Sequence, residues 1–148
     1  LDAPERDTAL ADFFARYQDN PLVLDKWYQV QALALRDDVA EHVKRLAAHP
    51  TFTLANPNRV RALYGAFAAN QGSFHRADGK GYQILADLIT TLDAKNPQTA
   101  ARMDLPLGRW KRFDRGRQAM MQAALELILA TPGLSKDVQE QASKSLSG

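Results

Sequence analysis

Histidine is the side chain that most often binds catalytic metals or moves protons near neutral pH. This 148-residue sequence contains three, His42, His49 and His75. A zinc hydrolase site needs two histidines one helical turn apart with a glutamate beside them, as in H-E-x-x-H. His42 and His49 would lie about two turns apart on a helix, and no thiol or acid-rich cluster completes a ligand set. The pattern therefore predicts no metal site in this chain.

Motifs for nucleophilic catalysis and for phosphate binding are not recognisable either. Gly72-Ser73 lacks the G-x-S-x-G pattern and a preceding strand. The segment DGKG at 78–81 has glycines and a lysine but not the spacing of a phosphate loop, and Asp-Gly is typical of a turn. The carboxylates of Asp37, Asp38 and Glu41 lie at the start of a helical pattern, where the helix N-terminus favours negative charge, so capping is their better interpretation. Taken alone, this chain is predicted not to be an enzyme.

The most basic part of the sequence is Arg102–Arg117, which contains six basic and two acidic residues. Trp110 and Phe113 are interleaved with these charges, an arrangement that could contact phosphates and stack on bases. The other interpretation is a solvated or partner-facing helix end, which is the usual role of a charge run. No helix-turn-helix or RNA-binding signature accompanies the stretch. We favour the solvated end, with nucleic acid as the alternative partner.

The composition describes an ordinary folded domain, with 45% hydrophobic and 24% charged residues. No apolar run approaches the ~18 residues that a membrane span needs. The sequence has no cysteine, which suits a reducing compartment such as the cytoplasm. It begins at Leu1 with a polar DAPERDT segment and no signal-peptide pattern. We therefore expect residues 1–148 to form a single domain cut from a longer cytoplasmic protein that does not contact a membrane.

Asn-Pro steps occur at Asn20-Pro21, Asn56-Pro57 and Asn96-Pro97, and Thr131-Pro132 follows 35 residues after the last of them. Each step is a helix-start signal, because its first side chain can accept from a free amide and proline fits the first helical position. Apolar residues at helical spacing fill the intervals. These patterns predict eight helices, at about 4–18, 21–35, 38–49, 57–69, 82–94, 97–105, 115–130 and 136–146.

Helix pairs that recur about every 38 residues are typical of helical-repeat arrays. No alternation of β-branched residues predicts a strand. The predicted fold is all-α, a right-handed superhelix of stacked antiparallel helix pairs, armadillo- or HEAT-like, around one continuous core. In the second helix, the residues predicted to face one side are Val23, Trp27, Val30 and Ala34.

The segment NPNRVRALYGAFAANQGSFHRADGKGY, residues 56–82, combines two arginines with a run of small residues. On a helix, Arg59 and Arg61 point about 200° apart, so one could anchor the structure while the other reaches a different surface. Leu63 and Phe67 form a packing stripe, and Gly65 is among the small residues that let a neighbour approach. A tight inner helix with ordinary surface arginines is the alternative interpretation.

Three segments carry a resemblance to a known family: DNPLVLDKWYQVQA, the 56–82 segment, and KNPQTAARMDLPLGRWKRFDRGRQAMMQAAL. They resemble the C-terminal helical domain of the bacterial aminopeptidase N family, which are zinc metallopeptidases also called alanyl aminopeptidases. The similarity extends from about Thr8 to Leu146. Its most specific part is the succession of NPNR-x-R, GAFA and FH-x-x-DG-x-GY.

The resemblance implies a role without catalysis. In that family the H-E-x-x-H zinc motif, a third glutamate ligand and the G-A-M-E-N segment lie on a separate upstream domain, and this chain has none of them. The C-terminal domain is a superhelix that closes over the catalytic domain and encloses a substrate chamber. The resemblance therefore implies that Arg61, Gln98 and Arg102 line this chamber and meet the peptide beyond the cleaved bond.

These inferences lead to one expectation and one alternative. We expect a non-catalytic C-terminal domain of a cytoplasmic zinc aminopeptidase that removes N-terminal residues from peptides. Its partners would be the catalytic domain of the same polypeptide, which holds the zinc, and the peptide substrate. The alternative is a free-standing helical-repeat module that binds an acidic protein or nucleic acid through Arg102–Arg117.

Overall fold

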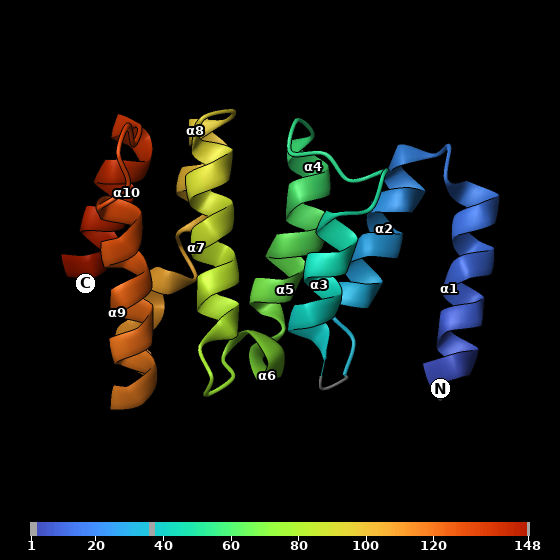
Figure 1. The fold of residues 1–148 in the computed structure, drawn as a ribbon, viewed down its shortest axis with the longest axis horizontal. Coiled ribbons are helices and arrows are strands. Elements are labelled where there is room, and N and C mark those ends of the chain that lie inside the picture. Colours follow the sequence, from blue (N-terminus) through green and yellow to red (C-terminus); the bar gives the residue numbers. More distant parts are fainter. Residues whose placement is uncertain (1–2, 36–37, 148) are drawn as a thin grey trace.

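The computed structural model describes residues 3–35 and 38–147, and most of them are helical (Figure 1). In chain order the helices are α1 (Ala3–Tyr17), α2 (Pro21–Ala32), α3 (Val39–Ala47), α4 (Pro57–Val60), the π-helical turn η1 (Arg61–Gly65), α5 (Ala66–Ala69), α6 (Gln71–Phe74), α7 (Lys80–Asp93), α8 (Pro97–Met103), the 3₁₀ helix η2 (Leu107–Arg112), α9 (Arg115–Leu129) and α10 (Lys136–Ser147). All eight predicted helices are present, since α4, η1 and α5 together form the one predicted at 57–69. No strand occurs among the described residues, and the all-α fold class is confirmed.

The three Asn-Pro steps begin helices in the predicted way. The side-chain oxygens of Asn20, Asn56 and Asn96 accept hydrogen bonds from amides of the following turn, at 3.3, 3.0 and 3.1 Å. In each case proline occupies the first turn of the helix. The local sequence is therefore sufficient to start α2, the 57–69 helix and α8.

Thr131-Pro132 does not begin a helix, so that prediction is wrong. The Thr131 hydroxyl instead donates back to the Leu127 carbonyl at the end of α9, at 3.0 Å. The start of α10 lies further on, where Ser135 Oγ accepts from the Val138 amide at 3.2 Å. The buried Asp93 carboxylate accepts from the Ser135 amide at 2.7 Å. The helix predicted at 136–146 is therefore present, with Ser135 as its local cap and the contact with α7 as additional support.

The start of α3 follows Asp38 as predicted, but without the expected capping hydrogen bond. Asp38 precedes the helix, but its carboxylate accepts no hydrogen bond from the first-turn amides. It forms an ion pair with Arg45 at 3.5 Å. The other predicted cap, Asp37, lies outside the described residues.

The buried face of α2 is rotated from the predicted one. Trp27 is buried as predicted, with Nε1 donating to the Leu10 carbonyl of α1 at 2.9 Å. Val30, however, is 59% exposed. The helix ends at Ala32, where the Asn70 side chain donates to the Ala32 carbonyl at 3.0 Å. The face prediction failed because α2 packs against α1, α3 and the 57–69 helix together, so no single apolar stripe defines its inner side.

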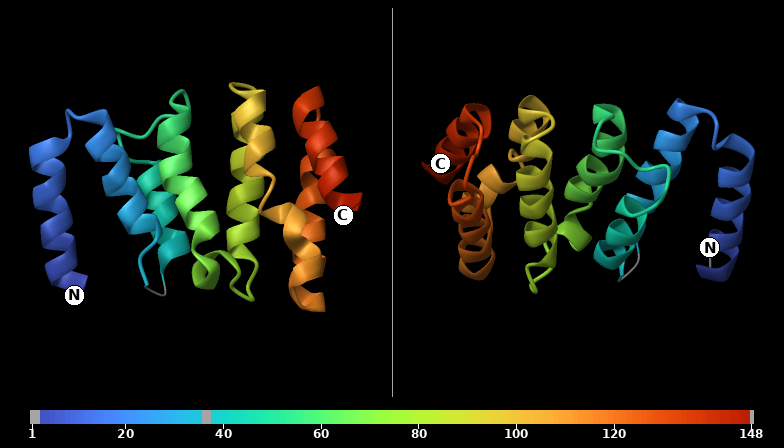
Figure 2. Two further views of the ribbon diagram at one scale, coloured as in Figure 1. Left: turned by 180° about the vertical axis from the view of Figure 1, so that it is seen from behind. Right: turned by 45° about the horizontal axis from the view of Figure 1, so that its top comes forward.

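The helices form a row that is two layers deep, with the two chain ends at opposite ends of the row (Figures 1 and 2). In one layer α3 contacts α7 and α7 contacts α9, and in the other α2 contacts α4 and η1 while α8 contacts α10. One continuous core lies between the layers; its largest fully buried aromatic side chains are Tyr28, Phe67, Phe74 and Tyr82. No helix in the described part of the chain is long and apolar enough to cross a membrane.

A buried carboxylate, Asp104, holds α10 against the segment that joins α8 to η2. Asp104 is 0% exposed, and its Oδ2 accepts from Ser145 Oγ of α10 at 2.6 Å. Its Oδ1 has no hydrogen-bond partner within the described residues. Trp110 Nε1 donates to the Ser145 carbonyl at 2.9 Å. Burial raises the pKa of Asp104 to about 6, although the Ser145 hydrogen bond acts to lower it.

Replacing Asp104 by asparagine is expected to raise the free energy of unfolding at pH 7 by on the order of 2 kcal/mol, with little change near pH 4. Because folding raises the pKa of Asp104, its proton stabilises the native state at low pH. That contribution is lost as pH rises through about 6. Asparagine is neutral throughout and avoids this loss. Urea denaturation at both pH values measures the difference, with Asp87→Asn, an exposed position on α7, as the control. Equal changes at the two pH values would contradict this explanation.

Candidate functional site

The two arginines of the 57–69 helix reach different environments, as their spacing predicts. Arg59 is 5% exposed; its Nε donates to Asp25 of α2 in an ion pair, and its Nη1 donates to the Thr51 carbonyl at 2.6 Å. Arg61 is exposed, and its Nη2 donates to Asn58 Oδ1 at 2.5 Å. Arg59 therefore anchors the helix to α2, and Arg61 remains available at the surface.

The helix widens for one turn at Arg61. In η1 the Ala66 amide donates to the Arg61 carbonyl five residues earlier, so the turn contains one residue more than an α-helical turn. Such π-helical turns are frequent at functional sites. Arg61 and Gly65, the first and last residues of η1, both line one cavity. No residue pattern in the sequence predicts this widening.

This cavity, of about 330 Å³, lies between α5 on one side and α8 and η2 on the other. Three of its lining residues are arginines, Arg61, Arg102 and Arg109, and all three are exposed. The rest are small, apolar or hydroxyl residues: Gly65, Ala68, Ala69, Thr99, Met103, Leu105 and Pro106. No carboxylate lines the cavity, and none of the three arginines forms an ion pair within the described residues. We call it the arginine cavity.

Gln98, the third residue predicted to line a chamber, lies in a neighbouring cavity of about 510 Å³ between α8 and α10. That cavity is lined by both signs of charge, including Asp137, Glu140 and Lys144 of α10. Arg102, one turn after Gln98 on α8, lines both cavities. The structure thus places Arg61 and Arg102 in one cavity. Gln98 lines the other cavity, and Arg102 is the residue that the two cavities share.

Arg109 was not among the sequence-predicted site residues. It belongs to the basic stretch 102–117, but nothing in its local pattern distinguishes it from Arg112 or Arg115. Only the placement of η2 against the end of α8 brings it to the arginine cavity. A tertiary contact therefore selects one arginine from a run of similar ones.

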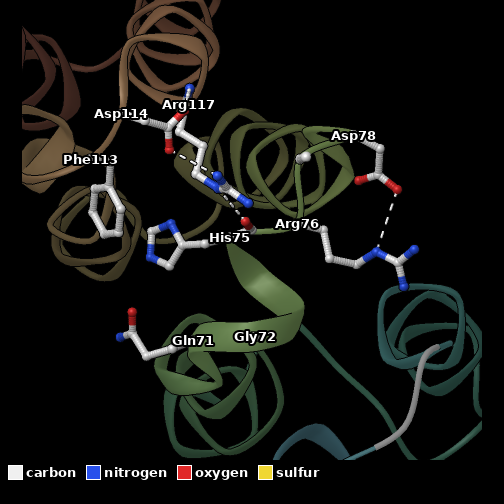
Figure 3. Close-up of a pocket in the computed structure, with 9 residues that line it drawn as sticks. Gln71, Gly72, His75, Arg76, Asp78, Phe113, Asp114 and Arg117 are labelled. Atoms are coloured by element: carbon white, nitrogen blue, oxygen red, sulfur yellow. Dashed lines mark hydrogen bonds and ion pairs between the residues drawn. The ribbon is translucent and has the colours of Figure 1, made fainter.

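A larger, open cavity of about 670 Å³ lies among α6, the loop before α7 and the start of α9 (Figure 3). The His75 ring stacks on Phe113 with centroids 4.1 Å apart, and its Nδ1 shares a hydrogen bond with the Tyr82 hydroxyl at 2.7 Å. Arg117 Nε donates to the His75 carbonyl at 2.6 Å, and its Nη1 pairs with Asp114 at 2.8 Å. Burial and the nearby Arg117 lower the pKa of His75, which favours the neutral imidazole. These contacts join α9 to the loop before α7, so the FH-x-x-DG-x-GY segment has a structural role here.

The two aromatic rings of Arg102–Arg117 have contacts within the domain, which favours the solvated interpretation over base stacking. Trp110 is partly buried and its Nε1 is bound to the Ser145 carbonyl. Phe113 is partly buried against His75. Both rings therefore already take part in contacts within the domain. Lys111, Arg112 and Arg115 are exposed, as in the solvated interpretation.

The other two histidines are engaged in hydrogen bonds with neighbouring side chains. His42 Nε2 lies 2.7 Å from Gln31 Oε1, and His49 Nδ1 lies 2.8 Å from Thr51 Oγ1. Burial lowers the pKa of His49. Across residues 3–35 and 38–147, no three histidine, aspartate or glutamate side chains are grouped so that they could hold a metal ion.

Comparison with known proteins gives a consistent set of relatives. The family described as "Domain of unknown function (DUF3458_C) ARM repeats" matches residues 1–147. The chain is 45% identical over 142 residues to Aminopeptidase N of Haemophilus influenzae and 43% identical over 144 residues to Aminopeptidase N of Escherichia coli. It is 48% identical over 142 residues to Aminopeptidase N of Caulobacter vibrioides. These alignments cover 95%, 97% and 95% of this chain.

The same alignments cover only 16%, 17% and 16% of the relatives, so the chain spans about one sixth of their length and matches their C-terminal part. A solved structure, that of Legionella pneumophila aminopeptidase A in complex with aspartic acid, is similar with a TM-score of 0.94 and 40% sequence identity. That match covers 99% of this chain and 17% of the Legionella chain. Sequence and fold therefore agree on the same group of proteins.

Proposed function

The chain belongs to the DUF3458_C family of ARM-repeat domains, and on this premise we propose that it is the non-catalytic C-terminal domain of a zinc-dependent aminopeptidase N. In this proposal it closes over the catalytic part of the same polypeptide and encloses the space in which peptides bind. The observation that carries the proposal is the 43–48% identity to three aminopeptidases N along nearly all of this chain.

The proposed zinc site lies in the remainder of the polypeptide. The residues described here do not fit a zinc site, because no group of histidine and carboxylate ligands is assembled among them. When bound in the catalytic part, zinc would supply the activated water for peptide hydrolysis. The helical domain contributes shape, access control and contacts to the peptide.

We assign the wall of the substrate space to Arg61, Gln98 and Arg102. Their side chains line two adjoining cavities, and Arg102 belongs to both. A guanidinium group can hold a carboxylate or backbone carbonyl oxygens with two parallel hydrogen bonds. These residues would orient the part of the peptide beyond the cleaved bond. Groups outside this chain would break that bond.

The proposed setting is the breakdown of peptides in the cytoplasm. This location is inferred from the sequence, in which none of the 148 residues is a cysteine, as suits a reducing compartment. Localising the full polypeptide by cell fractionation tests it.

The main test is to assay the full polypeptide and the separate 148-residue chain on an alanyl chromogenic amide, with and without a zinc chelator. We expect chelator-sensitive turnover from the full polypeptide only. Zinc-dependent turnover by the separate chain would contradict its non-catalytic role. If the full polypeptide released no N-terminal residue from amides or peptides, the aminopeptidase assignment would be wrong.

The same assay, run with tripeptide substrates, tests the wall residues. Replacing Arg61 and Arg102 together by alanine is expected to lower kcat/KM by on the order of tenfold, because each arginine loses charge-assisted hydrogen bonds. Both side chains are exposed in the separate chain, so folding stability should change by only about 0.5 kcal/mol per site. Arg112→Ala, an exposed arginine outside both cavities, is the control. Peptide kinetics equal to those of the control would exclude this role.

A further inference from the structure

We propose that the arginine cavity is a carboxylate-binding site and that Arg109 is its third ligand, beside Arg61 and Arg102. This inference rests on the proposed function for the nature of the ligand, which is a bound peptide. The carboxylate would belong either to the C-terminus of that peptide or to an acidic side chain within it.

The charges around the cavity are the first argument. Three guanidinium groups line it, and no aspartate or glutamate does. Arg61 donates a hydrogen bond to the neutral Asn58 side chain, and none of the three arginines has a carboxylate partner among the described residues. Other arginines of this chain behave differently, since Arg59 is paired with Asp25 and Arg117 with Asp114. The lining of the arginine cavity therefore carries positive charge without a carboxylate of its own, although Asp137 and Glu140 line the neighbouring cavity that Arg102 shares.

The shape of the cavity is the second argument. Its lining includes the small residues Gly65, Ala68 and Ala69, which leave space beside α8. A water molecule takes about 30 Å³ of liquid volume, so about 330 Å³ has room for a carboxylate and the residue that bears it. The apolar side chains of Met103 and Leu105 also line the cavity and could contact the aliphatic part of such a ligand.

The third argument is that each arginine comes from a separately fixed element. Arg61 begins the π-helical turn η1. The buried Arg59, two residues earlier, fixes the position of this turn through its ion pair with Asp25. Arg102 lies in the last turn of α8. Arg109 lies on η2, which the Asp104–Ser145 contact and the Trp110 indole hold against α10. Donors held on three anchored elements lose less freedom on binding than donors on one mobile loop.

The test is equilibrium binding to the full polypeptide of N-acetyl-Ala-Ala with a free carboxylate and of the same dipeptide as its carboxamide. N-acetylation removes the free amine that an aminopeptidase requires, so binding is measured without turnover. We expect the acid to bind on the order of tenfold more tightly than the amide, since charge-assisted hydrogen bonds are the stronger ones. Arg109→Ala should abolish this preference, and Arg112→Ala should keep it. Equal affinities of acid and amide, or an unchanged preference in Arg109→Ala, would overturn the proposal.

A second pair of variants tests the cavity without removing an arginine. Ala69 lines the cavity and is exposed, so Ala69→Glu places a carboxylate beside the three guanidinium groups, and Ala69→Gln is its uncharged counterpart. We expect Ala69→Glu to weaken binding of the acid at least several-fold more than Ala69→Gln does. If both substitutions weakened binding of the acid equally, the loss would come from the size of the new side chain and not from its charge. That result would overturn the proposal.

One further arm separates the two sources of the carboxylate. N-acetyl-Ala-Asp carboxamide carries only a side-chain carboxylate. If this compound binds more tightly than N-acetyl-Ala-Ala carboxamide, and Arg109→Ala abolishes the difference, the cavity accepts an acidic side chain. If only N-acetyl-Ala-Ala with its free carboxylate shows that difference, the cavity binds the C-terminus of the peptide. Failure of both carboxylates to bind would overturn the proposal. Because these measurements need no hydrolysis, loss of the carboxylate preference in an enzyme that still cleaves alanyl amides would leave the proposed function intact.

Discussion

Replacing Gly81 by alanine is expected to lower the free energy of unfolding by about 3 kcal/mol or more. A Cβ added at Gly81 would overlap the carbonyl oxygen of Phe74 and lie 2.9 Å from its carbonyl carbon. These are backbone atoms, so no side-chain rotation relieves the overlap. Phe74 and Tyr82 are both fully buried next to this contact, and the His75–Tyr82 hydrogen bond spans it. The first turn of α7 would have to move away from α6, which disrupts the centre of the core.

Gly72→Ala is the matched control for this prediction. Gly72 is exposed in α6, and an added Cβ there has no neighbour within 4 Å. Alanine should leave stability unchanged or raise it by about 0.5–1 kcal/mol, as expected for glycine to alanine in a helix. Urea denaturation followed by far-ultraviolet circular dichroism compares the two variants. If Gly81→Ala were as stable as Gly72→Ala, α6 and α7 would not approach as closely as described.

Replacing Arg59 by alanine is expected to lower the free energy of unfolding by about 3 kcal/mol, because it leaves the Asp25 carboxylate without its buried partner. The Arg59 and Asp25 side chains are only 6% and 16% exposed. The same guanidinium donates to the Thr51 carbonyl and lies 5.4 Å from the centroid of the Tyr28 ring. One side chain thus connects α2, the loop before α4 and the 57–69 helix.

Two comparisons show whether the loss comes from the broken ion pair. Arg61→Ala, two residues away and exposed, should change stability by no more than about 0.5 kcal/mol. The double variant Arg59→Met with Asp25→Leu removes both charges and should recover part of the loss, since buried pairs can be replaced by apolar residues. Denaturation in urea measures all of them. A double variant less stable than Arg59→Ala would contradict the assignment of the loss to an unpaired carboxylate.

Local signals in the sequence were enough to predict most helices. The Asn-Pro steps predict three helix starts because the cap, the proline and the free amide lie within three residues of one another. The predicted end of the sixth helix at about residue 105, just before Pro106, is likewise a local signal, and α8 ends nearby at Met103. The Thr131-Pro132 step is the exception, because it begins no helix; α10 begins at Lys136 as predicted, after Ser135, whose amide also donates to the distant Asp93 carboxylate.

The candidate site could be predicted only in part. The spacing of Arg59 and Arg61 predicts divergent directions, and the structure confirms that Arg59 is buried and Arg61 exposed. The joint cavity of Arg61 and Arg102 depends on the distance between α5 and α8, which no single helix encodes. Arg109 enters it through η2, whose position is set by the long-range contact between Asp104 and Ser145. The lining of the substrate space by Arg61, Gln98 and Arg102 stays a prediction.

The short separation of Arg59 and Arg61 links the inner scaffold to the outer surface. Because Arg59 is bound to Asp25, the axial rotation of the 57–69 helix is set by α2. Arg61 follows on the same helix, so any change that rotates the helix moves its guanidinium relative to the cavity. Substitutions on α2 are thus expected to change the position of Arg61 in the cavity, and with it the ligand contacts proposed above, from a distance. In directed evolution of such a protein, we expect libraries of α2 variants to differ in affinity for the proposed ligand as well as in folding stability.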